Sequence, residues 1–222
     1  MAKKNLSTEK TLSTEEKMIG KVSTFFEKNK MLLIVICAVI VVGILAAIIA
    51  VNAVNNAKDK AQIQVAKLEQ QYAEVLASEE QDWTALTADL QAMVKGGSYA
   101  SVKSQYILGL VYYQQQNYGD AADAFQKAYE LNKSIYLAPL SLANAAACAE
   151  ESGDSAKALE LYNQIYNDYP ESGTAAKALF NVARMYYQQG NTQLAQATFA
   201  QVADYYPNSE YGKLAQNLAN VL

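Results

Sequence analysis

The sequence predicts an all-α protein, in which a single N-terminal transmembrane helix precedes an α-solenoid built from helical hairpins. Two observations lead to this fold class. A run of 21 residues, 31–51, carries no charge and no side-chain amide. Beyond it, small and aromatic residues recur with a period of 37 residues. An uninterrupted apolar run of this length is typical of a membrane span, and a fixed period of about 20–50 residues is typical of stacked repeats.

The composition excludes several classes of protein. Of the 222 residues, 51% are apolar and 18% are charged, which excludes a wholly disordered chain. The chain has no histidine, so histidine-based triads and histidine-ligated zinc are excluded. Two cysteines are too few for a disulfide framework. With a net charge of −4, the chain as a whole is not expected to bind nucleic acid.

Residues 1–30 are predicted to form a cytoplasmic basic segment. They hold seven lysines and four glutamates, a net charge of +3, and the rest of the chain therefore carries −7. Ser13 and Glu16 fit a capping box, and apolar residues from Met18 to Phe26 then recur at helical spacing. This pattern predicts a short amphipathic helix on the inner leaflet, with lysines near anionic headgroups. An ordinary juxtamembrane extension of the span is the alternative.

Residues 31–51 are predicted to be the transmembrane helix. At about 1.5 Å per residue, this helix covers about 30 Å, the thickness of the bilayer hydrocarbon. Fourteen of its residues are Leu, Ile or Val, each of which favours insertion by about 0.3–0.6 kcal/mol. Removal as a signal peptide is the weaker alternative, because signal h-regions are only about 7–15 residues long. Four small residues form a candidate face for packing against another helix: Gly43, Ala46, Ala47 and Ala50.

The lysines on either side of the span predict its orientation. Seven lysines precede the span, whereas only Lys58, Lys60 and Lys67 follow it closely. Basic residues stay preferentially in the cytoplasm. We therefore expect a single-pass protein of a bacterial inner membrane, with a cytoplasmic N-terminus, a periplasmic C-terminal domain and membrane lipids around the span.

Three windows of the C-terminal part align without gaps. Ala121, Ala158 and Ala195 correspond at steps of 37, and an aromatic residue stands four positions after each of them. Pro170 and Pro207 are also 37 apart, and each follows a tyrosine. A helical hairpin alone leaves an apolar face in water, so such units stabilise one another by stacking.

At these positions the sequence resembles the tetratricopeptide repeat, whose pattern is Leu-Gly-x-x-Tyr on a first helix, then Ala-x-x-x-Phe-x-x-Ala on a second, then Pro. Leu108, Gly109 and Tyr112 match the first part. Alanine replaces glycine in the later repeats, and Lys133 stands where proline should close the first one. The resemblance implies three repeats over 101–209. Residues 52–100 then form a linker and a degenerate helix pair, and 210–222 a capping helix.

The resemblance also implies a binding groove, because the first helix of each such hairpin lines a concave surface. Aromatic rings and amides there could hold an extended or helical polypeptide. Arg184, the only arginine, could pair with a carboxylate or stack on a ring, or it could be a solvated helix residue. The implied groove residues are Tyr106, Leu110, Tyr113, Gln114, Leu140, Asn144, Ala147, Lys177, Phe180, Asn181, Arg184, Tyr187 and Gln188.

The layout is similar to that of the YfgM-type ancillary subunit of the bacterial SecYEG translocon, most closely in Phe25-Phe26-Glu27-Lys28-Asn29-Lys30. This resemblance implies a membrane-tethered protein that binds client polypeptides, translocon subunits or periplasmic chaperones. The alternative is a scaffold of an envelope complex, because the Tyr-Pro loop endings equally resemble outer-membrane assembly and Tol-associated proteins. No nucleophile–base pair, metal-ligand spacing or phosphate loop is present, so we expect no enzyme activity, metal, cofactor or small-molecule substrate.

Overall fold

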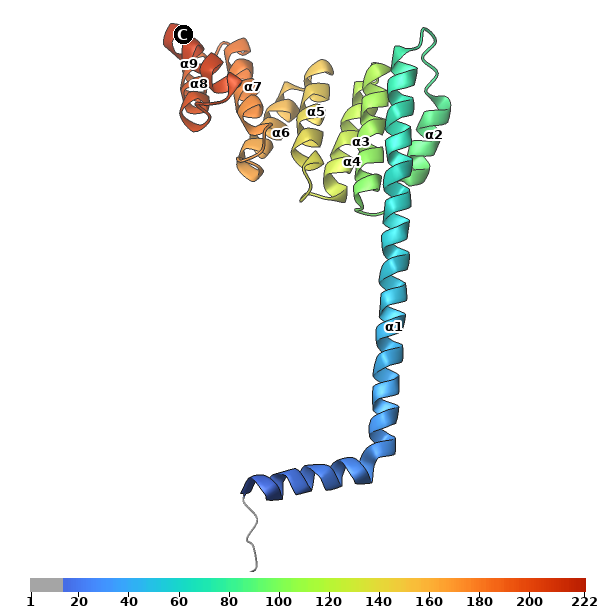
Figure 1. The fold of residues 1–222 in the computed structure, drawn as a ribbon. Coiled ribbons are helices and arrows are strands. Elements are labelled where there is room, and N and C mark those ends of the chain that lie inside the picture. Colours follow the sequence, from blue (N-terminus) through green and yellow to red (C-terminus); the bar gives the residue numbers. More distant parts are fainter. Residues whose placement is uncertain (1–13) are drawn as a thin grey trace, which may run out of the picture. The chain divides into compact units, whose positions relative to one another are not determined.

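The structure is a computed structural model that describes residues 14–222, with side chains from residue 18 onward. All regular secondary structure in this described part is helical, as the sequence predicts (Figure 1). The chain divides into two compact units, Met1–Asn56 and Ala57–Leu222. The proposed capping box at Ser13 and Glu16 lies outside the described side chains.

Helix α1, Thr14–Ala77, contains the apolar segment. An 18-residue window within Met18–Ala77 reaches a mean hydropathy of 3.5, and none of that window is buried. The helix is thus long and apolar enough to be a candidate membrane span, although an N-terminal signal sequence can also meet these criteria of length and hydropathy. The small-residue face of this helix is exposed, and a Cβ added to Gly43 would meet no atom within 4 Å. Its packing against another helix stays a prediction.

The second unit begins with the C-terminal turns of α1 and with α2, Thr84–Met93, which pack on α3, Tyr99–Gln114. Trp83 and Leu90 are buried in this cluster, and Tyr72 packs against the Trp83 ring at a centroid distance of 5.4 Å. These helices cover the side of α3 that would otherwise leave apolar residues in water, as the first element of a repeat array requires.

Three hairpins follow, in a register of 37 residues. They pair α3 with α4, Tyr118–Leu131; α5, Leu137–Glu151, with α6, Ser155–Asp168; and α7, Ala175–Gln188, with α8, Thr192–Tyr205. Each second helix is capped by a side chain that accepts a hydrogen bond from the backbone N–H three residues later. The capping residues are Asn117, Asp154 and Asn191.

Close approach of paired helices explains the small residue on each first helix. A Cβ at Gly109 would lie 2.7 Å from the Phe125 ring, which is itself 1% exposed. Ala146 and Ala183 occupy the same position in the later hairpins and are fully buried. In the first hairpin the aromatic ring therefore rests directly on the backbone of its partner helix.

The last hairpin is covered by α9, Glu210–Val221, which Ser209 caps by accepting from the Gly212 N–H at 2.9 Å. A Cβ at Gly212 would clash with the Tyr206 carbonyl oxygen, so this approach requires glycine. Ala215 of α9 and Phe199 of α8 are buried in the same cluster.

Candidate functional site

Hydrogen bonds link the first helices of neighbouring hairpins along one face. Asn144 on α5 donates from Nδ2 to the Tyr106 hydroxyl on α3 at 2.7 Å. Arg184 on α7 donates from one guanidinium nitrogen to both carboxylate oxygens of Glu150 on α5, at 2.6 and 2.8 Å. The structure thus brings Tyr106 and Asn144 of the predicted groove together, whereas Arg184 pairs with Glu150, which is not among the predicted groove residues.

The aromatic residues of this face also serve the core. The Tyr106 ring packs edge-on against Phe125, with centroids 5.3 Å apart, and burial raises the pKa of its hydroxyl. Phe180 contacts the rings of Phe199 and Tyr211 at centroid distances of 5.1 and 5.5 Å. Phe180 therefore fixes the last hairpin and its capping helix, and its removal would disturb packing as well as any bound partner.

Arg184 is not simply a solvated helix residue, because its guanidinium group forms an ion pair with the Glu150 carboxylate. Tyr162 donates a second hydrogen bond to the same carboxylate at 2.8 Å, and burial followed by this contact raises the pKa of Tyr162. Arg184 also donates to Gln188 at 3.1 Å and to Asn181 at 3.4 Å. Of the interpretations that the sequence left open, the structure has carboxylate pairing, and the partner lies within the chain.

The remaining predicted groove residues differ in how far they are open to a partner. Tyr187 has 53% of its surface exposed, the largest open ring on this face. Tyr113 is half-buried against the Tyr118 ring, with centroids 5.5 Å apart. Gln114, Lys177 and Gln188 are exposed, whereas Leu110, Leu140, Ala147 and Asn181 are half-buried.

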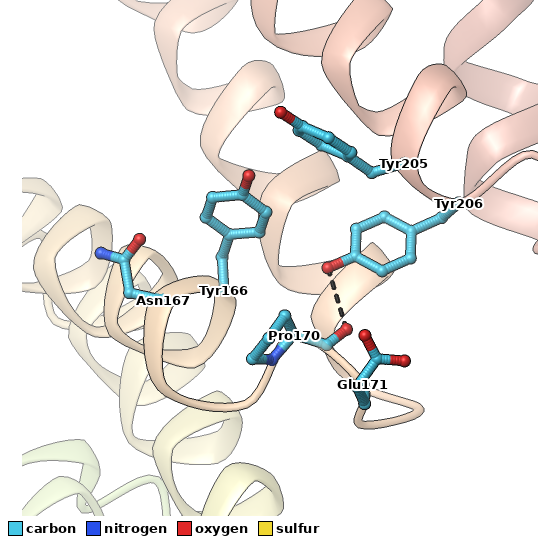
Figure 2. A pocket seen from close by; sticks show the side chains of 6 residues that line it. All are labelled: Tyr166, Asn167, Pro170, Glu171, Tyr205 and Tyr206. Atoms are coloured by element: carbon cyan, nitrogen blue, oxygen red, sulfur yellow. Dashed lines mark hydrogen bonds between the residues drawn. The ribbon is translucent and has the colours of Figure 1, made fainter.

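A pocket of about 400 Å³ lies on the other helix layer, between α6, α8 and the loop after α6 (Figure 2). Figure 2 shows the Tyr166, Tyr205 and Tyr206 side chains around this space. Asn167, Pro170 and Glu171 complete the lining. This pocket is not among the sites predicted from the sequence, although the Tyr-Pro pairs at a spacing of 37 indicate a feature that the two loops share.

Neither cysteine has the surroundings of a reactive thiol. Cys148 is fully buried on α5, and burial raises its pKa to about 11. A thiol with so high a pKa holds its proton at neutral pH and is a poor nucleophile. Cys37 lies in the apolar part of α1.

Hairpins in fixed register, stacked through buried alanines and closed by a terminal helix, define an α-solenoid of the tetratricopeptide type. The comparison with protein families agrees. One tetratricopeptide-repeat model matches residues 149–218 and a second matches residues 102–135. These residues therefore resemble tetratricopeptide repeats in sequence as well as in their helical arrangement.

Known proteins with this fold cover different shares of the chain. The TPR repeat-containing protein of Treponema pallidum (strain Nichols) is 28% identical over 123 residues, which are 54% of this chain and 50% of that protein. The chain thus spans about half the length of this curated relative.

Two solved structures support the architecture alone. A tetratricopeptide repeat protein from Parabacteroides merdae ATCC 43184 aligns with a TM-score of 0.53 and 19% identity, covering 71% of this chain and 59% of that one. The TPR-like repeats of a Podosopora anserina putative kinesin light chain align with a TM-score of 0.54 and 14% identity, covering 73% and 84%.

Proposed function

We propose that this chain is a membrane-tethered adaptor that binds partner or client polypeptides through the face of α3, α5 and α7. α1 is the anchor, and the repeats lie on the periplasmic side, where they serve the translocon as an ancillary subunit or chaperone-like adaptor. The observation that carries the proposal is that aromatic and polar side chains of successive first helices contact one another, Tyr106 with Asn144 between α3 and α5 and Glu150 with Arg184 between α5 and α7. Such a face offers apolar contact and side-chain hydrogen bonds to an extended or helical segment.

The open part of this face centres on α7. Tyr187 presents a large ring at low entropic cost, and Lys177 and Gln188 offer polar contacts beside it. Arg184 and Glu150 already form an ion pair with each other, so they stabilise the packing of α5 against α7 and are not expected to bind a charged partner.

Site-specific photo-crosslinking tests the face. A photoreactive amino acid at Tyr187 should capture polypeptides in cells, whereas the same group at Leu194, an exposed position on α8, should capture few. Many heterogeneous products would favour the chaperone-like role, and one fixed neighbour would favour the scaffold of an envelope complex. Equal capture from both positions would refute the groove.

A substitution complements the crosslinking. Tyr187→Ala should reduce capture from a photoreactive group at Gln114 without lowering helicity, because the Tyr187 side chain is largely in solvent. Phe180 is unsuitable for this purpose, since it packs under α9. Leu194→Ala is the matched control for loss of an exposed apolar side chain.

Protease accessibility tests the tether and its orientation. Protease added to intact spheroplasts should degrade the repeats, and the full-length chain should stay in the membrane through a carbonate wash. Protection of the repeats, or release by carbonate, would overturn the proposed topology.

A further inference from the structure

Neighbouring hairpins meet at two junctions, one at the loop after α4 and one at the loop after α6. The same set of hydrogen bonds, here called the frame, holds the loop at both junctions. Gln164 donates to the Tyr129 hydroxyl at 2.8 Å, and one period later Gln201 donates to the Tyr166 hydroxyl at 3.1 Å. Both tyrosine rings are therefore held in the same way by the following hairpin.

A second pair of tyrosines closes this frame. Tyr169 donates to the Lys133 carbonyl at 2.8 Å, and Tyr206 donates to the Pro170 carbonyl at 3.0 Å. These acceptors are backbone atoms, so the frame survives a change of side chain at the accepting residue.

At the first junction this frame holds a cation from the chain itself. The Lys133 ammonium lies 4.7 Å from the centroid of the Tyr129 ring and 2.9 Å from a Glu130 carboxylate oxygen. An ammonium group over a tyrosine face is attracted by the ring quadrupole, and the neighbouring carboxylate adds to that attraction.

At the second junction, no lysine or arginine of the described residues lies over the equivalent ring. Pro170 stands at the position of Lys133, while Tyr166 keeps the position of Tyr129. A tyrosine, Tyr205, replaces Asp168 of the first junction, and its ring lies 6.1 Å from that of Tyr166. None of the residues that line this pocket is a lysine or arginine.

A carboxylate stands beside these rings at a different position, because Asn167 replaces Glu130 and Glu171 replaces Ser134. Glu171 lines the pocket, and its negative charge is among the causes that raise the pKa of the Tyr206 hydroxyl, after burial and Tyr166. Figure 2 shows the three rings and this carboxylate around the space next to Pro170. The pocket combines aromatic faces with one uncompensated negative charge among its lining residues.

We propose that the pocket at Tyr166, Tyr205 and Glu171 binds a basic side chain, lysine or arginine, of a partner polypeptide. The incoming cation takes the place that Lys133 occupies one repeat earlier. This site lies on α6 and α8 and does not depend on the groove formed by the first helices. A single such contact is weak, with millimolar affinity, and contributes by adding to other contacts of the same partner.

Binding is tested on the full chain in maltoside micelles, whose headgroups carry no cation. Tyrosine rings labelled with ¹³C report on titration with N-acetyl-lysine methylamide, with N-acetyl-norleucine methylamide as the neutral probe of similar shape. The lysine probe should shift the ring signals of Tyr166 and Tyr205, assigned through Tyr→Phe variants, and the norleucine probe should not. Equal shifts with both probes would overturn the proposal, because the pocket would then select apolar groups.

Variants sharpen the result. Glu171→Gln and Tyr205→Leu should each weaken binding about two- to fivefold, the change expected for one charge or one ring face. Glu151→Gln, the same charge change at an exposed residue outside the pocket, is the control and should leave binding unchanged. Thermal melting by circular dichroism checks that each variant folds.

Pro170→Lys should abolish binding, because it restores the chain's own cation as at Lys133. If this variant bound the lysine probe as tightly as the unchanged chain, the comparison between the junctions would be wrong. Titration with tetramethylammonium and with a lysine-containing pentapeptide separates the sources of the cation. Binding of tetramethylammonium without binding of the pentapeptide would exclude a polypeptide ligand.

Discussion

The junction between the first and second hairpins and the junction between the second and third share one register of 37 residues, but they carry their charged side chains on opposite sides. In the first junction the first-helix face is joined by the neutral pair of Tyr106 and Asn144, and the cation, Lys133, lies at the loop side. In the second junction the ion pair of Arg184 and Glu150 lies on the first-helix face, and the loop side has no cation of its own. Equivalent backbone frames can therefore present different chemistry.

The hairpins also differ at two backbone positions. Gly109 stands where the later hairpins have alanine, and Gln116 stands where they have Gly153 and Gly190. Gln116 adopts φ of 60°, close to the 82° and 77° of the two glycines. The first hairpin thus keeps the common geometry at a strained turn residue, and its close helix contact depends on the absence of a side chain.

The largest expected effect is at Gly109. Gly109→Val should lower the free energy of unfolding by about 3 kcal/mol, because its Cβ alone would lie 2.7 Å from the Phe125 ring and must displace it. Urea unfolding measured by circular dichroism checks the value. Combining Gly109→Val with Phe125→Leu should cost less than the sum of the two single changes, since the smaller side chain makes room. Simple additivity would contradict a direct clash.

Breaking the ion pair of the second junction should have the next largest effect. Arg184→Gln should cost about 1–2 kcal/mol, because it leaves the partly buried Glu150 carboxylate with Tyr162 as its remaining side-chain partner. Asn144→Ala in the first junction should cost about 1 kcal/mol, as expected for a neutral hydrogen bond. Equal losses in urea titrations would show that the two junctions do not differ in the way described.

The residue at this turn can be changed in each hairpin toward the type found in the other. Gln116→Gly should raise the free energy of unfolding by about 0.5–1 kcal/mol, whereas Gly153→Ala should lower it by about 1 kcal/mol, because only glycine adopts positive φ without strain. Neither change meets a packing obstacle at the glycine sites, since a Cβ at Gly153 has no atom within 4 Å. Thermal melting of both variants measures the pair, and a loss on Gln116→Gly would contradict strain at this turn.

The smallest expected effect concerns alkaline pH. Burial raises the pKa of Tyr169 to about 12, above the value of about 10 in the unfolded chain. Its contribution to stability is therefore present below pH 10 and is lost as the pH rises from about 10 to about 12. Tyr169→Phe should make the decline of stability over this interval shallower, in chemical unfolding measured at several pH values. An unchanged slope would mean that the hydroxyl titrates normally.

The sequence predicts the local structure well where one period repeats. The buried small residues follow from comparing positions 37 apart. The caps at Asn117, Asp154 and Asn191 have the same spacing and could have been foreseen from it. The unbroken helix through residues 52–77 could have been foreseen too, because the chain has no glycine or proline between Gly43 and Gly96. Helix breakers, and their absence, are readable from the chain alone.

The site is harder to predict because it depends on departures from the period. The sequence marks Arg184 as unusual, but Glu150, which stands at the position of Tyr113 and Tyr187 in the 37-residue register, is identified as its partner only by the crossing of α5 and α7. The pocket on the other layer likewise arises from the exchange of Lys133 for Pro170, which a search for matching residues does not weigh. The groove residues accordingly remain a prediction, now with Tyr187 as the most open of its rings.

Tyr169 and Tyr206 each donate to a backbone carbonyl of the preceding loop, so their hydrogen bonds do not depend on the side chain of the accepting residue. The accepting residue can therefore change, as between Lys133 and Pro170, without loss of this hydrogen bond. A duplicated 37-residue repeat would therefore form the same hydrogen bond without a matching substitution in the neighbouring repeat. An array joined in this way can lengthen by gene duplication while each loop acquires its own ligand preference.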